Sequence, residues 1–187
     1  MKESNFKDFL GNERNLDRII RFSAQMRLKD ESVSEHSFHT ALYAMILADL
    51  EERVFKNKVD KEKVLKTALL HDLEECLTGD IIYNFKHTEK TLTEQIKKMS
   101  KKFLEDLMKK LPKEISGDYM SLWQNSKDTQ KIEGKIIEAA DKLEGLIYSL
   151  NEFSLGNKAF GKIIKGYQKQ FKEINLKSLD FILQQIL

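Results

Sequence analysis

The chain of 187 residues is poor in the residues that break helices or cross-link chains. It contains one proline, eight glycines and a single cysteine, Cys76. A lone cysteine excludes an intramolecular disulfide. Few glycines and prolines, together with abundant lysine and glutamate, favour an all-α protein over a β-sandwich or a barrel.

Long apolar runs and an excess of one charge are also missing. The longest apolar run, near residues 41–48, is too short and too polar for the ~20 residues that span a bilayer. The chain does not begin with a basic, apolar signal segment, so we expect a cytoplasmic protein. Because 32 basic and 30 acidic residues leave a net charge of +2, neither a nucleic acid polymer nor a membrane is an expected partner.

The hydrophobic pattern predicts a single helical domain covering residues 1–187. A hydrophobic share of 41% is enough for one core in a chain of this length. Ser34, Asp60 and Asp128 have the chemistry of helix N-caps, and Gly79 and Gly156 that of stops. Apolar spacing predicts helices over residues 3–10, 15–27, 34–55, 60–76, 91–111, 112–124, 128–153, 158–173 and 176–187.

The most informative stretch is His71–Asp80, which reads HDLEECLTGD. A histidine followed by an aspartate ends an apolar run, so two metal-competent side chains lie where a buried helix reaches the surface. Neighbours on a helix point ~100° apart, so both bind one ion only if other elements supply further ligands. His36 and Asp141 are the candidates. Imidazole and carboxylate together suit Mn, Fe, Co, Ni or Zn, and Cys76 is not expected to be a ligand.

Each of these residues also has a simpler interpretation. Asp141 interrupts an apolar run, where an unpaired buried carboxylate would cost several kcal/mol. A metal ion would compensate it, but so would a salt bridge or a place on the wet face of the helix. His36 could be a solvated residue in a first helical turn, and His39 competes for the same role. The residues alone leave these choices open.

The motifs around these positions resemble those of the HD-domain superfamily of metal-dependent phosphohydrolases, in particular the bacterial YfbR-like 5'-deoxynucleotidases. The resemblance implies a single-domain HD-domain helical bundle, with its motifs within about residues 14–155, and one divalent metal ion. It assigns His36, His71, Asp72 and Asp141 as the ligands and leaves His39 as a bystander. The matching residues are Arg21-Phe22, Val33–Ser37 (VSEHS), His71-Asp72, Glu75, Thr78–Asp80 and Ala140-Asp141.

The same resemblance implies roles for three further residues. Arg21 would orient the phosphate, Glu75 would position or deprotonate the attacking water, and Asp80 would contact the sugar 3'-hydroxyl or assist proton transfer. These roles agree with the chemistry, since guanidinium offers a planar fork to phosphate and a carboxylate one turn after Asp72 can reach the same cleft. Without the resemblance, Arg21 reads as a surface cation, Glu75 as a solvated helix residue and Asp80 as a turn residue.

The sequence departs from the family pattern at the substrate side. Phe22 stands where the family has a tryptophan that crowds out a ribose 2'-hydroxyl, so weaker selectivity for deoxy substrates is expected. The segment after Asp80 reads IIYN where the family has a proline, with Lys86 placed to meet an anion. A second metal ion is not expected, because binuclear HD sites use extra histidines and only His39 and His87 remain.

We therefore predict an enzyme that removes the 5'-phosphate of (deoxy)nucleoside monophosphates by attack of metal-activated water. One alternative is a phosphodiesterase or nucleotide-pyrophosphate hydrolase, because HD sites differ mostly in their pocket walls. Another is a non-catalytic, metal-stabilised nucleotide-binding module, which the presence of Glu75 beside all four ligands disfavours. The lysine-rich amphipathic helices could pair in a homodimer.

Overall fold

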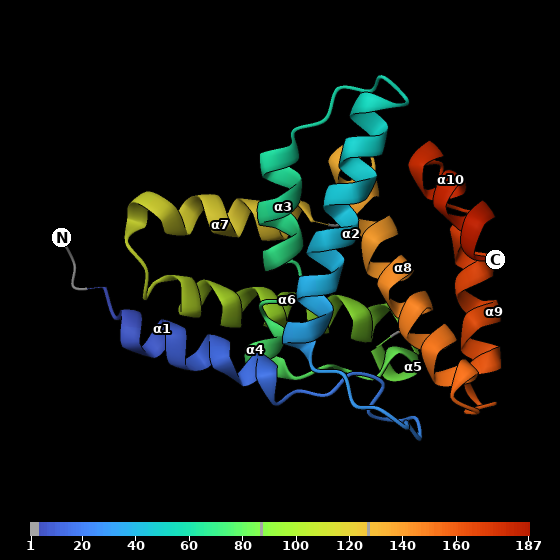
Figure 1. Cartoon of the computed structure of the whole chain (residues 1–187). Coiled ribbons are helices and arrows are strands. Elements are labelled where there is room, and N and C mark those ends of the chain that lie inside the picture. The colour runs from blue at the N-terminus through green and yellow to red at the C-terminus, as the bar shows by residue number, and fades with distance from the viewer. Residues whose placement is uncertain (1–3, 87, 127) are drawn as a thin grey trace.

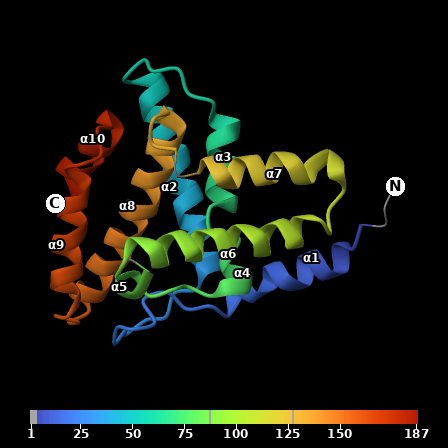
Figure 2. The same cartoon turned by 180° about the vertical axis from the view of Figure 1, so that it is seen from behind.

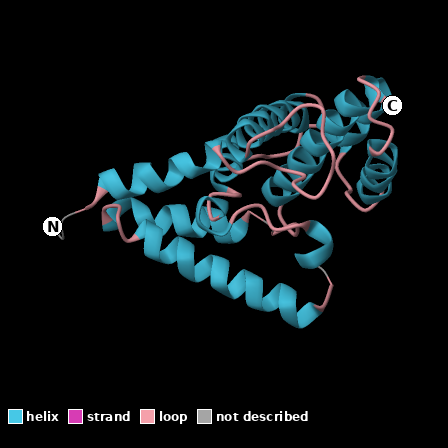
Figure 3. Ribbon diagram, turned by 90° about the horizontal axis from the view of Figure 1, so that it is seen from below, coloured by secondary structure: helices cyan, strands magenta, loops and turns pink. Residues whose placement is uncertain are grey.

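The computed structural model describes residues 4–86, 88–126 and 128–187, and its regular elements are helices (Figures 1 and 3). The described residues contain no β-strand beyond one isolated bridge between Ile20 and Ser32, so the all-α prediction is confirmed. None of the helices in these ranges is both long and apolar enough to cross a bilayer. In chain order the elements are α1 (Phe6–Glu13), the 3-10 helix η1 (Arg14–Asp17), α2 (Val33–Arg53), α3 (Lys61–Leu70), α4 (Glu75–Thr78), α5 (Tyr83–Lys86), α6 (Lys90–Met108), α7 (Lys113–Asn125), α8 (Ile132–Ser154), α9 (Phe160–Phe171) and α10 (Lys177–Ile186).

The main core lies between α2, α3 and α8, with α9 and α10 packed on the outer side (Figures 1 and 2). Alanine is frequent where these three helices meet. Because alanine has a short side chain, helices that bury it can approach closely, and this brings the polar ends of α2 and α3 next to α8. The fully or almost fully buried alanines are Ala44, Ala48, Ala68, Ala139 and Ala140.

A second core lies beside the first and is formed by α1, α4, α6 and α7. Helices α6 and α7 run as a hairpin next to α1, away from α9 and α10 (Figure 2). Leu73 and Cys76 belong to this second core, whereas Val64 and Ala68 of α3 belong to the first. The segment that follows α3 therefore passes from one core to the other.

This passage explains why the predicted helix 60–76 is wrong. Helix α3 ends at Leu70, His71 is its C-cap, and α4 begins only at Glu75. Short-range bonds replace the α-helical ladder, since the Leu73 N–H donates to the Leu70 carbonyl at 3.1 Å. Gly79 ends α4 with φ +73°, a left-handed conformation that glycine adopts without strain.

The predicted helix 15–27 is also wrong. The 3-10 helix stops at Asp17, and residues 20–32 form a loop closed at its neck by a hydrogen bond from the Arg21 N–H to the Glu31 carbonyl at 2.9 Å. Residues far along the chain fix the loop. The Glu152 carboxylate accepts the N–H groups of Leu28 and Lys29 at 2.9 and 2.8 Å, so tertiary bonds replace those of a helix.

Two predicted helix starts are corrected. The cap of α2 is Ser32 rather than Ser34, and Ser32 forms a reciprocal capping box with Glu35, which satisfies two free N–H groups at the helix start. Helix α8 begins after Lys131 without a side-chain cap, so Asp128 is not its cap. The Asp128 carbonyl instead packs against Gly134, where a Cβ atom would lie 2.0 Å from its oxygen. The predicted caps and stops at Asp60 and Gly156 are confirmed.

Candidate active site

Four predicted ligands come from three places in the chain and meet at one point. His36 lies in the first turn of α2, His71 and Asp72 follow the end of α3, and Asp141 lies on α8. The Nε2 atom of His36 is 3.2 Å from Nε2 of His71 and 3.4 Å from a carboxylate oxygen of both Asp72 and Asp141. The Nε2 atom of His71 is 3.0 Å from the same oxygen of Asp72.

The donor atoms of His36, His71 and Asp141 lie within 4.8 Å of one another and could hold one metal ion, and Asp72 places an oxygen beside both histidines. Imidazole nitrogen and carboxylate oxygen bind such ions at about 2.0–2.2 Å, so tetrahedrally placed donors lie about 3.3–3.6 Å apart and closer donors suit a higher coordination number. His36 and His71 are 0% and 2% exposed, whereas the side chain of Asp141 is 41% exposed. The cluster is therefore closed on the histidine side and open at Asp141, as a centre that admits substrate requires.

Hydrogen bonds at the far side of each imidazole ring orient the two histidines. Nδ1 of His71 lies 2.7 Å from the Ala68 carbonyl oxygen. Nδ1 of His36 lies 2.6 Å from a carboxylate oxygen of Glu144. A carbonyl and a carboxylate only accept hydrogen bonds, so each Nδ1 carries a proton, and Nε2 is the ring nitrogen that faces the carboxylates of the cluster.

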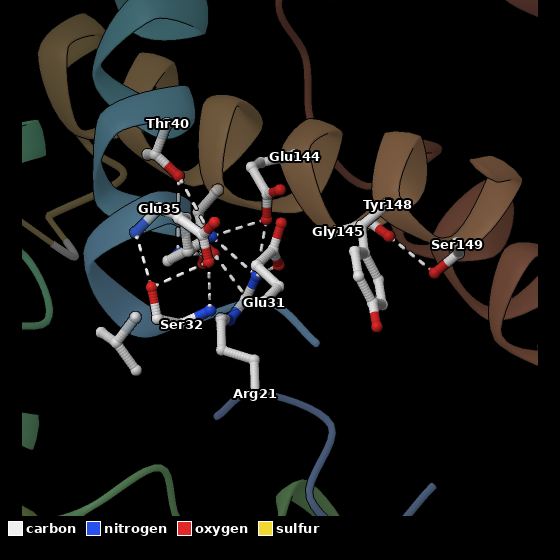
Figure 4. Close-up of polar contacts among 12 residues, drawn as sticks. Arg21, Glu31, Ser32, Glu35, Thr40, Glu144, Gly145, Tyr148 and Ser149 are labelled. Carbon is white, nitrogen blue, oxygen red and sulfur yellow. Dashed lines mark hydrogen bonds and ion pairs between the residues drawn. The ribbon is translucent and has the colours of Figure 1, made fainter. Parts of the chain in front are cut away.

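Arg21 lies directly beneath the cluster and is not a surface cation, since its side chain is only 14% exposed. Its Nη1 atom is 2.5 Å from Glu144 and 3.2 Å from Glu31 (Figure 4). Its Nη2 atom faces Asp141 at 3.9 Å and makes no hydrogen bond with the residues described. Burial alone would lower the pKa of Arg21, but the neighbouring carboxylates raise it above its ordinary value. The guanidinium stays charged, with its Nη2 edge turned toward Asp141 of the cluster.

Glu75 and Asp80 stand at the two ends of the short helix α4 and are both partly buried. Burial raises the pKa of Glu75 well above its ordinary value, and the carboxylates of Asp72 and Asp80 raise it further. Burial also raises the pKa of Asp80, against the effect of Arg21. A carboxylate with a raised pKa is a stronger proton acceptor, which suits acid–base work beside the cluster.

Phe22 and Lys86, the predicted substrate contacts, flank this region. The ring of Phe22 stacks on Tyr148 at 5.1 Å with an interplanar angle of 9° and meets Phe160 edge-on at 5.7 Å. The Arg21 guanidinium carbon is 5.3 Å from the Phe22 ring centroid. Lys86 ends α5 and lowers the pKa of Asp80, which places the two charges near each other. Their contacts with substrate stay predictions.

Two glutamates of the site were missed in the sequence. Glu144 could have been found, because it lies three residues after Asp141 and thus on the same helix face. Glu31 gives no such signal, since it lies in the loop 20–32; burial and the nearby Glu144 raise its pKa to about 8. His39 lies outside the donor cluster and packs against Tyr43. His87 lies outside the described residues.

Comparisons with known proteins identify a family of similar sequences. A sequence model of the YfbR-like 5'-deoxynucleotidase family matches residues 8–187. A 5'-deoxynucleotidase of Photorhabdus laumondii is 30% identical over 166 residues, which cover 89% of this chain and 84% of the relative. A 5'-deoxynucleotidase of Pectobacterium atrosepticum is 32% identical over 142 residues, or 76% of this chain and 71% of the relative.

Solved structures share the fold. An HD-domain phosphohydrolase from Listeria innocua superimposes with a TM-score of 0.83 at 24% identity, over 97% of this chain and 87% of that one. A cyanophage S-2L HD phosphohydrolase, solved with dA and one catalytic zinc ion, gives a TM-score of 0.64 at 14% identity, over 94% of both chains. The helical arrangement described above is thus that of HD-domain phosphohydrolases.

Proposed function

The chain belongs to the YfbR-like 5'-deoxynucleotidase family and is a metal-dependent hydrolase of nucleotide phosphate esters, and we propose that it removes the 5'-phosphate of deoxynucleoside monophosphates at the four-donor cluster. The observation that carries this proposal is the geometry of the cluster: four donor side chains converge from α2, the end of α3 and α8, and the cluster is open on one side. Arg21 faces Asp141 at that opening, and the carboxyl groups of Glu75 and Asp80 interact electrostatically with Asp72.

The metal ion is the first part of the proposal. His36, His71, Asp72 and Asp141 would hold one divalent ion, and a donor set of two imidazoles and two carboxylates suits Mn, Fe, Co, Ni or Zn. When bound, such an ion lowers the pKa of water at its open position and offsets phosphate charge. The two aspartates also neutralise the ion, so the cluster needs no further anion to hold it.

The neighbouring side chains supply the remaining steps. Arg21 donates from its free Nη2 edge to a phosphate oxygen, because its Nη1 edge is already held by Glu31 and Glu144. Glu75 accepts a proton from the attacking water, as its raised pKa favours. Asp80 contacts the sugar 3'-hydroxyl, Lys86 meets the outer charge of the nucleotide, and Phe22 borders the sugar.

A substrate panel combined with Glu75→Gln tests the proposal. The panel contains dAMP, AMP, dATP and an aryl phosphodiester, each assayed with Mn²⁺, Co²⁺ or Zn²⁺. We expect inorganic phosphate from dAMP, and a fall in kcat of about 100-fold or more in Glu75→Gln with the bound metal retained. Pyrophosphate from dATP would instead identify a nucleotide-pyrophosphate hydrolase, and cleavage of the diester alone a phosphodiesterase. Metal binding without turnover of any substrate would instead indicate a non-catalytic binding module.

A further inference from the structure

Glu144 is a buried carboxylate that serves two partners with one oxygen atom. It lies on α8 one turn after Asp141 and is 2% exposed. Its Oε2 atom is 2.6 Å from Nδ1 of His36 and 2.5 Å from Nη1 of Arg21 (Figure 4). A buried carboxylate is costly without partners, and these two partners belong to the proposed metal centre and phosphate site.

The Nδ1 atom of His36 faces two groups of opposite hydrogen-bonding character. Arg21 Nη1, at 2.7 Å, can only donate, whereas Glu144 Oε2, at 2.6 Å, can only accept. If Arg21 alone faced Nδ1, a neutral ring would accept there and carry its proton on Nε2. A protonated Nε2 has no lone pair for a metal ion. With Glu144 present, Nδ1 keeps the proton and Nε2 stays available.

Thr40 does not select the tautomer of His36. Its hydroxyl oxygen is 3.4 Å from Nδ1 and 3.5 Å from Nε2 of His36, which are long contacts for a hydrogen bond. A hydroxyl can also donate or accept, so it favours neither tautomer.

We infer that Glu144 is the positioning residue that holds His36 in its metal-binding tautomer and fixes Arg21 beside it. The inference rests on the proposed function, since it concerns the same metal centre. The role of Glu144 in fixing Arg21 follows from the contacts of the guanidinium. Glu144 and Glu31 hold its Nη1 atom, and this leaves Nη2 facing Asp141. One carboxylate thus contacts both a proposed metal ligand and the proposed phosphate-binding group.

Glu144→Gln tests the inference, with Glu51→Gln as a matched control. The amide keeps the size of Glu144 but removes its charge and its obligatory acceptor character. Glu51 is also buried, at 1% exposure, but it holds the Ser178 N–H and the Asn57 amide away from the donor cluster. Isothermal titration of the full-length, metal-free proteins with Co²⁺ measures affinity, and ¹⁵N NMR of the His36 ring, recorded at a pH where the ring is neutral, reports which nitrogen carries the proton.

We expect Glu144→Gln to bind Co²⁺ about 10–100-fold more weakly than the wild type and to move the His36 proton toward Nε2. Glu51→Gln should change neither quantity. Wild-type affinity and an unchanged His36 tautomer in Glu144→Gln would overturn the inference. If Glu144→Gln does not fold, Glu144→Asp keeps the charge but withdraws the oxygen, and weaker Co²⁺ binding is again expected, while wild-type binding refutes the role.

A third variant separates this inference from the proposed function. His71→Ala removes a proposed ligand and should bind Co²⁺ more weakly than Glu144→Gln. If His71→Ala binds Co²⁺ as the wild type does, the metal centre itself is misplaced. If His71→Ala loses the ion and Glu144→Gln does not, the centre stands and only the role of Glu144 is refuted.

Discussion

Replacing His71 by alanine should abolish the stabilisation that a divalent metal ion gives to the fold. The His71 side chain is 2% exposed, with Nε2 3.2 Å from His36 and 3.0 Å from Asp72, so alanine would leave the cluster without a buried nitrogen donor. An ion that binds only the native state stabilises it by about 2.7 kcal/mol at 100 times its Kd. For a domain of this size, each kcal/mol raises Tm by about 2–4 °C, so metal should raise the wild-type Tm by about 5–11 °C.

His39→Ala is the matched control, because His39 lies one turn after His36 on α2 and outside the donor cluster. Differential scanning calorimetry with excess Co²⁺ or with EDTA gives the shift for each variant. The quantity compared is the rise in Tm on adding metal, and not the Tm itself, since loss of the hydrogen bond from His71 to Ala68 also lowers the metal-free Tm. We expect the full shift in His39→Ala and almost none in His71→Ala. Equal shifts in the two variants would refute the ligand assignment.

Three further substitutions test the sugar side and the backbone. Phe22→Trp should raise the ratio of kcat/KM for dAMP over AMP by about 10-fold or more, since a larger ring beside the sugar would exclude a 2'-hydroxyl at a cost of ~1–3 kcal/mol. An unchanged ratio in a folded variant would mean that Phe22 only packs against Tyr148 and Phe160. Gly134→Ala should destabilise the protein by about 2 kcal/mol or more, because its Cβ would lie 2.0 Å from a backbone oxygen. Gly117→Ala, on α7 with nothing within 4 Å of the added carbon, should instead stabilise by about 0.5–1 kcal/mol in urea unfolding.

The helices that carry the site could be predicted from hydrophobic spacing, because their signals are local. The cap at Asp60 and the stops at Gly79 and Gly156 depend on residues within one turn. The assignment of the four donor residues as metal ligands could be predicted only through the motif resemblance. The structure brings these side chains together, and their role as ligands stays a prediction.

The wrong predictions for residues 15–27 and 71–76 occurred where distant residues decide the local structure. The loop 20–32 carries a helical pattern, but Glu152, 123 residues after Lys29, takes its N–H groups. Helical spacing also continues through Leu73 and Cys76, yet these side chains pack into the second core and not into the first. Glu144 pairs with Arg21 across 123 residues, so spacing places it near Asp141 but does not reveal its partner.

The position of α8 in the chain determines when the metal centre can form during protein synthesis. His36 and His71 are 35 residues apart, whereas Glu144 follows His36 by 108 residues. Chains grow from the N-terminus at about 5–20 residues per second, so α2 and α3 leave the ribosome before α8 exists. Until then the nascent chain offers only three of the four proposed ligands, His36, His71 and Asp72, and lacks Glu144. Helix α8 brings Asp141 and Glu144 into the fold together, so the proposed metal centre can be complete only after the helix that closes the main core has been made.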